Sequence, residues 1–521
     1  MKERSDDKSK DTVSQVEVNP VLSTVVSLDG REIEIHQLDA DVALQYHQDA
    51  MDLVMDPEFE RKLVRKIDWC LMPVIAALMS CQLMDKTTNS YASIMNLQKD
   101  LNMSDKEYSW VGSTFYFGYL IFQFPANLLL QKLPLSKTLG AAVMIWGVVL
   151  MCHAACTNAA GFLVCRVVLG VFEGFMNPAY VLLTSQWYRK SEQFMRACVW
   201  WGFQGFGTLL GAGIAYGLSV HRSGNYSFDS WRMLYIITGV ITIALGFLSF
   251  VHVPDLPVKA WFLNETEKKY CVERVKGNQQ GFGSHKFKRH QMLEAFRDPV
   301  LYLFFLYGMS YAIPNGGFTN FGSILLKGDF GFSTQNALLM GMPGGAIDIV
   351  FPISVAYLTY RFLNNSRLIS SIIVQIITII GMCCLNFSSP KGSRLFGYLS
   401  FYMATSVSAG MVSVLSSNVA GSTKKVTMNT TYLVGYCVGN IIGPQTFISS
   451  QKPGYIGAKT AMLVSFAVGL LCIVALLLLY THRNRARDKK RAALGDKYQV
   501  PDTIAFADLT DIENPEFRYS L

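Results

Sequence analysis

Apolar residues are gathered along the chain into long runs that are separated by shorter polar stretches. A helix needs about 20 consecutive, mostly apolar residues to cross the hydrocarbon core of a membrane. Runs of roughly this kind lie near residues 69–84, 108–130, 138–156, 160–185, 197–220 and 232–252, and then 299–325, 335–360, 367–387, 395–418, 428–449 and 458–480. The pattern predicts an all-α polytopic membrane protein with twelve transmembrane helices in two six-helix lobes.

The polar stretches divide the chain into lobes, tails and a loop. We expect a cytosolic N-terminal tail (1–66), an N-terminal lobe (67–252), a cytosolic central loop (253–298), a C-terminal lobe (299–481) and a cytosolic C-terminal tail (482–521). Two six-helix halves around a long loop are typical of secondary transporters with a binding site near the bilayer midplane. An even number of spans places both tails on one side, and the basic residues of the tails and central loop predict that this side is the cytosol.

Composition agrees with a chain whose surface mostly faces lipid. The sequence is 51% hydrophobic and only 16% charged, whereas an average soluble domain is about 25% charged. Several soluble domains would need more polar surface than this chain supplies. The net charge of +8 comes largely from basic residues next to apolar runs, so it indicates contact with a lipid bilayer and not with nucleic acid.

Sequence patterns that would indicate an enzyme are missing. The sequence contains no Walker A pattern, no nucleophile elbow and no HExxH motif. The 11 cysteines include no CxxC pair and lie mostly within apolar runs, so we expect neither a disulfide framework nor a metal site. The chain is therefore predicted not to be an enzyme and to need no cofactor.

Ionisable residues inside the apolar runs are functional candidates, because each costs several kcal/mol to place in a membrane. Arg166 and Glu173 are seven residues apart in the fourth run, about two helical turns, and so share one helix face. Asp85 and Lys86 close the first run, and Asp348 lies in the eighth. Simpler interpretations stay open: an ion pair that only positions its helix, a helix end whose charges reach toward water, and a structural carboxylate at Asp348.

Several motifs occur in one order along the chain. They are Met84-Asp-Lys-Thr87, Arg166-Val-Val-Leu-Gly-Val-Phe-Glu173-Gly-Phe-Met-Asn-Pro178, Trp187-Tyr-Arg-Lys-Ser-Glu192, Trp231-Arg232, Val253-Pro-Asp-Leu-Pro257, Ile313-Pro-Asn-Gly-Gly-Phe-Thr-Asn-Phe-Gly322 and Gly439-Asn-Ile-Ile-Gly-Pro-Gln445. Together they resemble the anion:cation symporter branch of the major facilitator superfamily, and within it the fungal allantoate permease family. The resemblance runs from about residue 58 to residue 480. It departs from the superfamily in the loop from Leu130 to Lys137, which has no carboxylate.

This resemblance implies proton-coupled uptake of a small organic anion by alternating access, the anion being a carboxylate, a vitamin-like compound or a sulfur-containing compound. Glu173 and Asp85 are the expected proton-coupling carboxylates, and Arg166 and Lys86 are the expected cations for the substrate. The other residues that we expect to contact substrate are Tyr116, Gln204, Asn315 and Asn440. The only coupling ion expected is the proton.

A nutrient sensor built on the same fold, with little flux, is the alternative function. The long tails would then be its signalling surfaces, although a sensor does not need to keep a proton site. A channel is disfavoured because the sequence shows no pore loop or ring of charges. We expect a monomer in the plasma membrane, with the endoplasmic reticulum as the alternative location.

Overall fold

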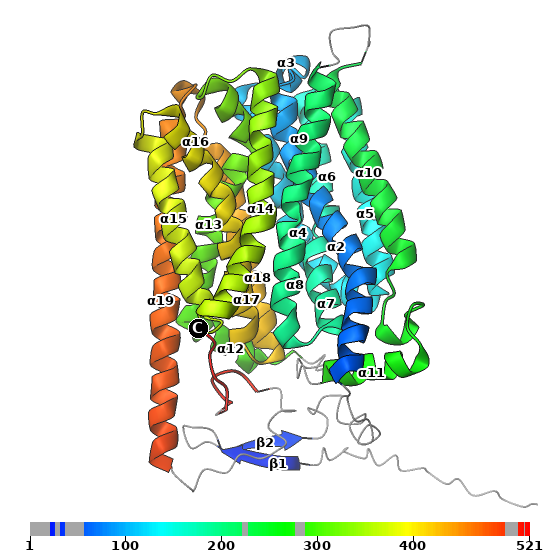
Figure 1. Cartoon of the computed structure of the whole chain (residues 1–521), viewed down its shortest axis with the longest axis vertical. Coiled ribbons are helices and arrows are strands. Elements are labelled where there is room, and N and C mark those ends of the chain that lie inside the picture. Colours follow the sequence, from blue (N-terminus) through cyan, green and yellow to red (C-terminus); the bar gives the residue numbers. More distant parts are fainter. Residues whose placement is uncertain are drawn as a thin grey trace, which may run out of the picture.

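The computed structural model describes residues 21–26, 32–36, 57–220, 228–276, 287–494 and 509–521, except residue 515. Residues 1–20, 27–31, 37–56, 277–286 and 495–508 of the predicted tails and central loop lie outside the described residues. The described residues form one bundle of long helices (Figure 1). Two short strands, β1 (Val21–Val26) and β2 (Glu32–His36), pair in antiparallel fashion in the segment expected to be a weakly patterned tail.

The N-terminal lobe contains six bundle helices, two of which are interrupted. They are α2 (Pro57–Ser93), α4 (Asp105–Lys132), α5 (Leu135–Cys152), α6 (Ala159–Glu173) with α7 (Met176–Trp187), α8 (Lys190–Gly202) with α9 (Gln204–Val220), and α10 (Ser230–His252); the short α3 (Leu97–Asp100) and the 3-10 turn His153–Ala155 connect them. The break after Glu173 has a local cause. Pro178 has no N–H to donate to the carbonyl of Gly174, and the loss of this hydrogen bond favours a break in the helix here.

The C-terminal lobe repeats this plan. Its helices are α13 (Pro299–Gly328), α14 (Thr334–Phe362), α15 (Arg367–Phe387), α16 (Lys391–Ser400) with α17 (Ala404–Asn418), α18 (Ser422–Gln445) and α19 (Ile456–Leu494). The 3-10 turns Phe401–Met403 and Ser449–Gln451 belong to this lobe, and the central loop contributes the 3-10 turn Pro257–Lys259, α11 (Glu265–Lys276) and α12 (Arg289–Arg297). This confirms the all-α fold of two six-helix lobes.

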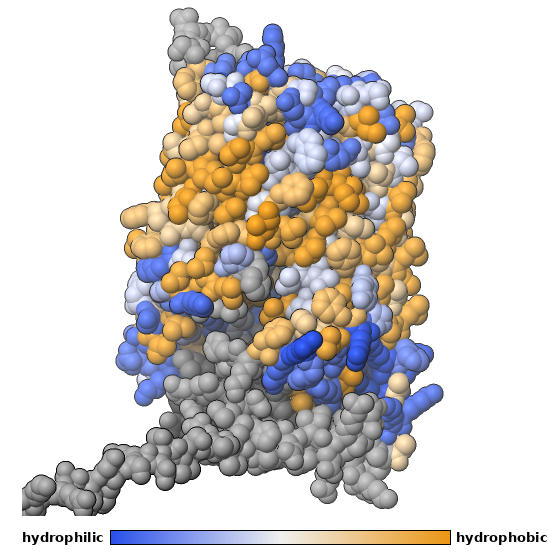
Figure 2. Space-filling view, turned by 180° about the vertical axis from the view of Figure 1, so that it is seen from behind, coloured by the Kyte–Doolittle hydropathy of each residue, from blue (hydrophilic) through white to orange (hydrophobic). Residues whose placement is uncertain are grey.

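Hydropathy alone finds fewer spans than the bundle contains. Among the described residues, eight helical segments are long and apolar enough to cross a membrane by length and composition. The helices outside this set, α4, α8–α9, α13 and α18, pack within the same bundle and carry more polar residues. Figure 2 shows an apolar band around the middle of the bundle with polar side chains gathered toward its two ends.

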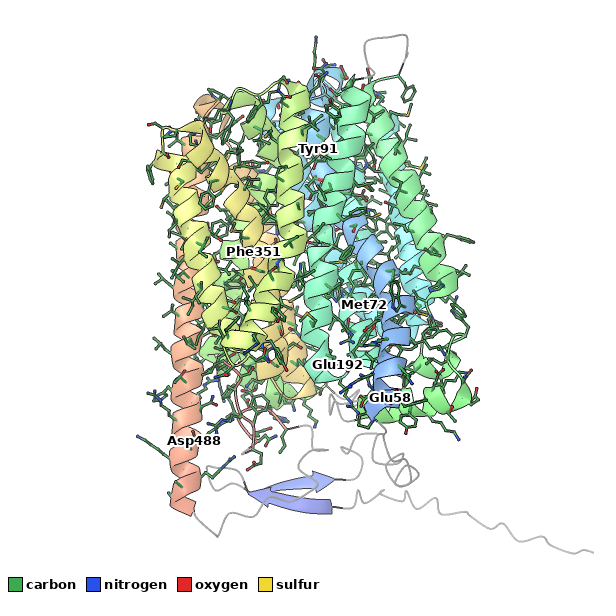
Figure 3. The ribbon with its side chains drawn as sticks, viewed as in Figure 1. Glu58, Met72, Tyr91, Glu192, Phe351 and Asp488 are labelled. Atoms are coloured by element: carbon green, nitrogen blue, oxygen red, sulfur yellow. The ribbon has the colours of Figure 1, made fainter. Side chains whose placement is uncertain are left out.

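The first and last helices are longer than the apolar runs predicted. The helix α2 begins at Pro57, inside the segment expected to be a tail, and Figure 3 shows Glu58 at one end of it and Tyr91 near the other. The helix α19 continues through basic residues to Leu494. Arg, Lys, Glu and Ala are good helix formers in water, so helices can extend beyond the lipid where hydropathy no longer detects them.

The two lobes meet mainly where α2 packs against α13, α4 against α18, and α8 and α9 against α14. Within the N-terminal lobe, Gly207 permits an unusually close contact, since a Cβ there would lie 1.9 Å from the carbonyl oxygen of Ser80. Small residues bring helix backbones together in this way inside membranes. The position fixes α9 directly against α2, the helix that carries Asp85 and Lys86.

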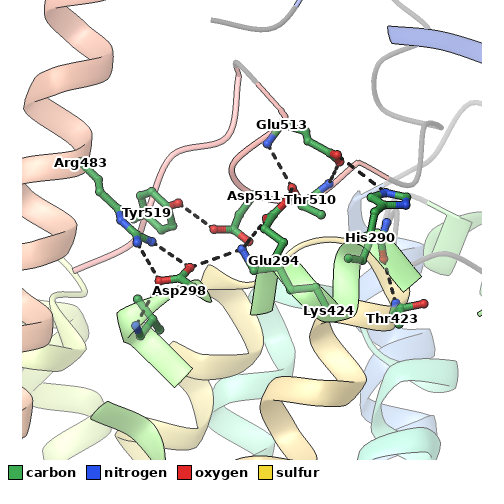
Figure 4. A network of polar contacts seen from close by, with 12 residues as sticks. His290, Glu294, Asp298, Thr423, Lys424, Arg483, Thr510, Asp511, Glu513 and Tyr519 are labelled. Carbon is green, nitrogen blue, oxygen red and sulfur yellow. Dashed lines mark hydrogen bonds and ion pairs between the residues drawn. The ribbon is translucent and has the colours of Figure 1, made fainter. Parts of the chain in front are cut away.

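The C-terminal segment 509–521 docks on the end of the C-terminal lobe at which α17 ends and α18 begins (Figure 4). Asp511 forms an ion pair with the buried Lys424 of α18 at 2.7 Å, and the backbone N–H of Arg367 donates to the carbonyl of Leu521 at 2.8 Å. The Asn418 side chain donates to the carbonyl of Ser520 at 2.8 Å. The end of the predicted tail is therefore part of the folded lobe.

Candidate functional site

An ion pair lies buried where α2 meets the end of α6. The Lys86 Nζ atom is 2.7 Å from Glu173 Oε1; the Glu173 side chain is fully buried and that of Lys86 is 15% exposed. Lys86 also lies 5.4 Å from the centre of the Phe115 ring of α4. The Phe115 ring contacts that of Tyr116, which in turn lies against Tyr436 of α18 in the other lobe. The pair therefore lies next to the interface between the lobes.

Arg166 does not pair with Glu173, although the spacing of seven residues between them suggested that pair. Its Nη2 atom donates a hydrogen bond to the Tyr235 hydroxyl at 2.7 Å, and the Tyr235 hydroxyl donates to Asn89 Oδ1 at 2.5 Å. The side chain is almost completely buried, and its guanidinium lies near the Phe162 and Tyr235 rings. Arg166 thus points into the N-terminal lobe, among α2, α6 and α10.

The structure therefore corrects the direct pairing of Arg166 with Glu173 that the sequence suggested, because the partner of Glu173 is Lys86. Residues seven apart share a helix face but lie about 10.5 Å apart along the axis. Each side chain meets the neighbouring helix at its own height, so a shared face does not bring the two side chains together.

Asp85 completes the set of charges. It is fully buried, and its Oδ2 atom accepts a hydrogen bond from Thr242 Oγ1 at 3.5 Å. Asp85 and Arg166 both face α10, through Thr242 and Tyr235 respectively. Two carboxylates and two cations therefore share this part of the lobe, and their formal charges cancel when all four are ionised. Such a set can take up a proton or an anion only if another charge is neutralised or exchanged.

Three of the uncharged residues predicted to contact substrate lie together on the lobe interface. Asn315 Nδ2 donates to Asn440 Oδ1 at 2.9 Å and to the Tyr436 hydroxyl at 3.3 Å. The ring centres of Tyr436 and Tyr116 are 6.1 Å apart, so this cluster crosses from α18 to α4. Amides and phenols of the C-terminal lobe thus approach the side of the interface on which Lys86 lies.

Two other candidates lie elsewhere. Gln204 begins α9 and is half-buried, and the described residues give its side chain no hydrogen-bond partner. The next residue, Gly205, packs so closely on α14 that a Cβ would lie 2.7 Å from Asp348 Cβ. Asp348 is buried at this contact between α9 and α14. Among the described residues, neither Gln204 nor Asp348 forms a hydrogen bond or ion pair with Lys86 or Glu173.

Sequence reasoning missed the uncharged polar residues that hold the charges. Tyr235 accepts from Arg166 and donates to Asn89, and the Tyr436 hydroxyl accepts from Asn315. Asn89 could have been found, because it lies four residues after Asp85, one helical turn further along α2. Tyr235 and Tyr436 gave no such signal, since tyrosines are common in membrane helices and only the packing shows which ones face a charge.

The chain is similar in sequence to a family of known membrane proteins. Residues 74–444 match the model of the Major Facilitator Superfamily. An uncharacterized transporter of Schizosaccharomyces pombe is 41% identical over 98% of this chain and 100% of its own length. The allantoate permease of Saccharomyces cerevisiae is 40% identical over 99% of this chain and 98% of its own.

A more distant relative is a thiamine pathway transporter of Saccharomyces cerevisiae, 32% identical over 89% of this chain and 87% of its own. Among solved structures, a proton:xylose symporter bound to 6-bromo-6-deoxy-D-glucose gives a TM-score of 0.62 at 15% identity, over 78% of this chain and 95% of that one. That similarity shows the fold alone. From its sequence relatives and its fold, the chain is a membrane transporter and not an enzyme, and it belongs to the fungal allantoate permease family of the major facilitator superfamily.

Proposed function

We propose that this transporter carries a small organic anion together with a proton, by alternating access of one site to the two sides of the membrane. The observation that supports the proposal is the buried Lys86–Glu173 ion pair beside the lobe interface. A buried cation needs a counter-charge, because removing one partner of a buried pair leaves an uncompensated charge at low dielectric. In the empty site, Glu173 supplies that charge.

Protonation of Glu173 would release Lys86 for a new anionic partner. A substrate carboxylate can then take the place of the Glu173 carboxylate, so that the proton and the anion enter the site together. Neither enters easily alone, since a proton without the anion leaves Lys86 unpaired and an anion without the proton adds a second negative charge. Replacement of the Glu173 carboxylate by the substrate carboxylate therefore couples proton binding to anion binding, and no other residue is needed for this coupling.

The proposal assigns the first contact with the substrate to Lys86, and gives Arg166 a supporting role. Arg166 donates to Tyr235 of α10, and Asp85, which we propose as the second titrating carboxylate, accepts from Thr242 of the same helix. Asn315, Asn440 and Tyr116 would contact the uncharged part of the substrate from the other side of the interface. Gln204, which lies elsewhere at the start of α9, is kept as a further candidate for substrate contact.

The substrates to test first are small carboxylates, allantoate among them, since a permease named for allantoate is 40% identical to this chain. We propose the plasma membrane as its location and a monomer as its working form. The assay is uptake of labelled substrate by cells that lack their own carrier, in acidic and in neutral medium, with and without a protonophore.

Glu173→Gln is the decisive variant in this assay. It should lose uptake against a gradient but still exchange substrate across the membrane in a counterflow assay, because the neutral side chain mimics the protonated state. A Glu173→Gln protein that accumulates substrate with the pH dependence of the unmodified protein would overturn the assignment. No measurable flux of any anion, with growth responses to nutrients intact, would favour the sensor instead.

A further inference from the structure

Polar contacts join the two lobes at the end of the bundle opposite the C-terminal segment. The Tyr108 hydroxyl of α4 donates to the carbonyl of Asn320 of α13 at 2.8 Å, and the backbone N–H of Ser323 donates to the Ser90 hydroxyl at 3.0 Å. Asn89 Nδ2 lies 3.5 Å from Asn320 Oδ1. These contacts close the lobes against each other at the outer end, and we refer to them as the outer closure.

The outer closure is tightly packed around Asn320. A Cβ at Gly112 of α4 would lie 2.5 Å from Asn320 Nδ2, so α4 approaches α13 as closely as a glycine permits. The Asn320 Nδ2 atom donates back to the carbonyl of Gly316 at 2.8 Å. Because its nitrogen is used within α13, the amide of Asn320 turns its oxygen toward Asn89.

Asn89 is oriented in the complementary way. Its Oδ1 atom accepts from the Tyr235 hydroxyl at 2.5 Å, which leaves its Nδ2 atom to donate across the interface to Asn320. An asparagine amide can rotate to exchange its oxygen and nitrogen, so the hydrogen bond from Tyr235 selects the orientation that fits Asn320.

Tyr235 is itself held rigidly. Its ring stacks on His153 with centres 5.2 Å apart and planes 8° from parallel, and the Phe162 ring meets it edge-on at 5.8 Å. Its hydroxyl accepts from Arg166 and donates to Asn89, so both functions of the one oxygen are used. A continuous path of hydrogen bonds therefore runs from Arg166 through Tyr235 and Asn89 to Asn320 of the other lobe.

From this path we infer that Tyr235 is a positioning residue that links the buried charges of the N-terminal lobe to the outer closure. Tyr235 is fully buried between Arg166 and Asn89. It fixes the Asn89 amide so that the lobes close at the outer end while Arg166 remains in place. Its role in transport rests on the proposed function, in which the charges around Arg166 change during the cycle, whereas its role in the outer closure does not.

The test measures opening of the outer closure without any substrate. Ser323→Cys is the reporter, because Ser323 is buried at the contact and its hydrogen bond to Ser90 uses the backbone N–H, which the substitution keeps. Its rate of labelling by a membrane-impermeant thiol reagent is measured in intact cells, after subtraction of the labelling of the chain without the reporter. Tyr235→Phe should raise this rate about fivefold, the shift expected from the loss of one hydrogen bond.

Two further variants test the path rather than the residue alone. Asn320→Ala should raise the labelling rate by a similar factor, and the double variant with Tyr235→Phe should label no faster than the faster single variant, since both remove the same link. Asn89→Leu, which leaves the bond from Arg166 to Tyr235 in place, should behave like Tyr235→Phe and provides a second measurement if that variant does not reach the cell surface.

Tyr180→Phe is the matched control. Tyr180 is a buried tyrosine of the same lobe whose hydroxyl contacts only Met176 Sδ, at 3.8 Å, among the described residues. It should leave the labelling rate unchanged. The inference is overturned if Tyr235→Phe and Asn89→Leu label at the control rate, or if the effects of Tyr235→Phe and Asn320→Ala multiply as independent changes. Neither result bears on proton or anion coupling, because the assay contains no substrate.

Discussion

The Glu173→Gln substitution should lower the free energy of unfolding, because it leaves the buried charge of Lys86 unpaired. Binding of an anion should recover most of the lost stability. The two groups are 2.7 Å apart, Glu173 is fully buried and Lys86 is 15% exposed. Removing one partner of a buried ion pair typically costs about 3–5 kcal/mol. The small exposed fraction of Lys86 lets some water reach its amine, so we expect a value near the lower end, about 3 kcal/mol.

A carboxylate ligand should recover most of this loss. A ligand present at about 100 times its dissociation constant stabilises the folded protein by about 2.7 kcal/mol. In the unmodified protein, the anion must compete with the Glu173 carboxylate for Lys86, so the same concentration should stabilise it less at neutral pH. The variant is therefore expected to be the less stable protein alone and the more strongly stabilised one with the anion.

The assay is thermal unfolding of the purified protein in lipid discs, with and without allantoate or another transported carboxylate. The double variant Lys86→Met/Glu173→Gln is the control, since it removes both charges and should regain most of the stability without responding to the anion. The reasoning is refuted if Glu173→Gln unfolds at the same temperature as the unmodified protein and the anion raises the two unfolding temperatures equally. Lys86 would then not be a buried cation that needs an anionic partner.

Three other outcomes follow from the same contacts. Arg166→Lys keeps the charge but loses the planar fork that meets Tyr235, so transport measured by uptake should fall while the protein still reaches its membrane, and Arg166→Ala should abolish transport. Although burial opposes it, hydrogen bonds from Arg483 and the charge of Lys424 hold the pKa of Asp298 below its ordinary value of 3.8. The stability that the ionised Asp298 contributes is therefore complete at pH values above the ordinary pKa, and it is lost as the pH falls through the lower pKa of the folded protein. Acid unfolding of Asp298→Asn should lack this part of the pH dependence. The pair Asp105–Lys452 is 42% and 46% exposed, so the double alanine variant should change the unfolding free energy by less than about 1 kcal/mol.

The pattern of apolar runs was sufficient for the fold, because a helix that crosses lipid must satisfy its own backbone and needs a minimum apolar length. It could not predict where helices end in water. At Ser104, a capping box with Glu107 starts α4 before the apolar run begins, and charged helix formers extend α19 to Leu494. Such ends depend on local hydrogen bonds and helix propensity, to which hydropathy is blind.

The candidate site, too, could be predicted from the sequence only in part. Ionisable residues within apolar runs, such as Lys86 and Glu173, are visible in a sequence because their cost in a membrane is high. Their partners are not visible, since the choice between Arg166 and Lys86 as the partner of Glu173 depends on the height at which α2 crosses α6. Tyr235 illustrates the limit, because nothing in the sequence separates it from the other tyrosines until its hydroxyl is seen between Arg166 and Asn89.

The chemistry around the ion pair is divided unequally between the lobes. Asp85, Lys86, Arg166 and Glu173 all come from α2 and α6 of the N-terminal lobe, whereas Asn315, Tyr436 and Asn440 on the facing helices are uncharged. Joint uptake of a proton and an anion then requires no ion pair between side chains of different lobes, so the lobes can separate without breaking an ion pair at this point. Breaking a buried pair costs several kcal/mol, whereas hydrogen bonds between amides and phenols exchange with water at a net cost of about 1 kcal/mol each. Because the charges stay within one lobe, opening the interface costs little free energy. The uncharged residues of the other lobe can then contact, and discriminate between, the uncharged parts of different substrates.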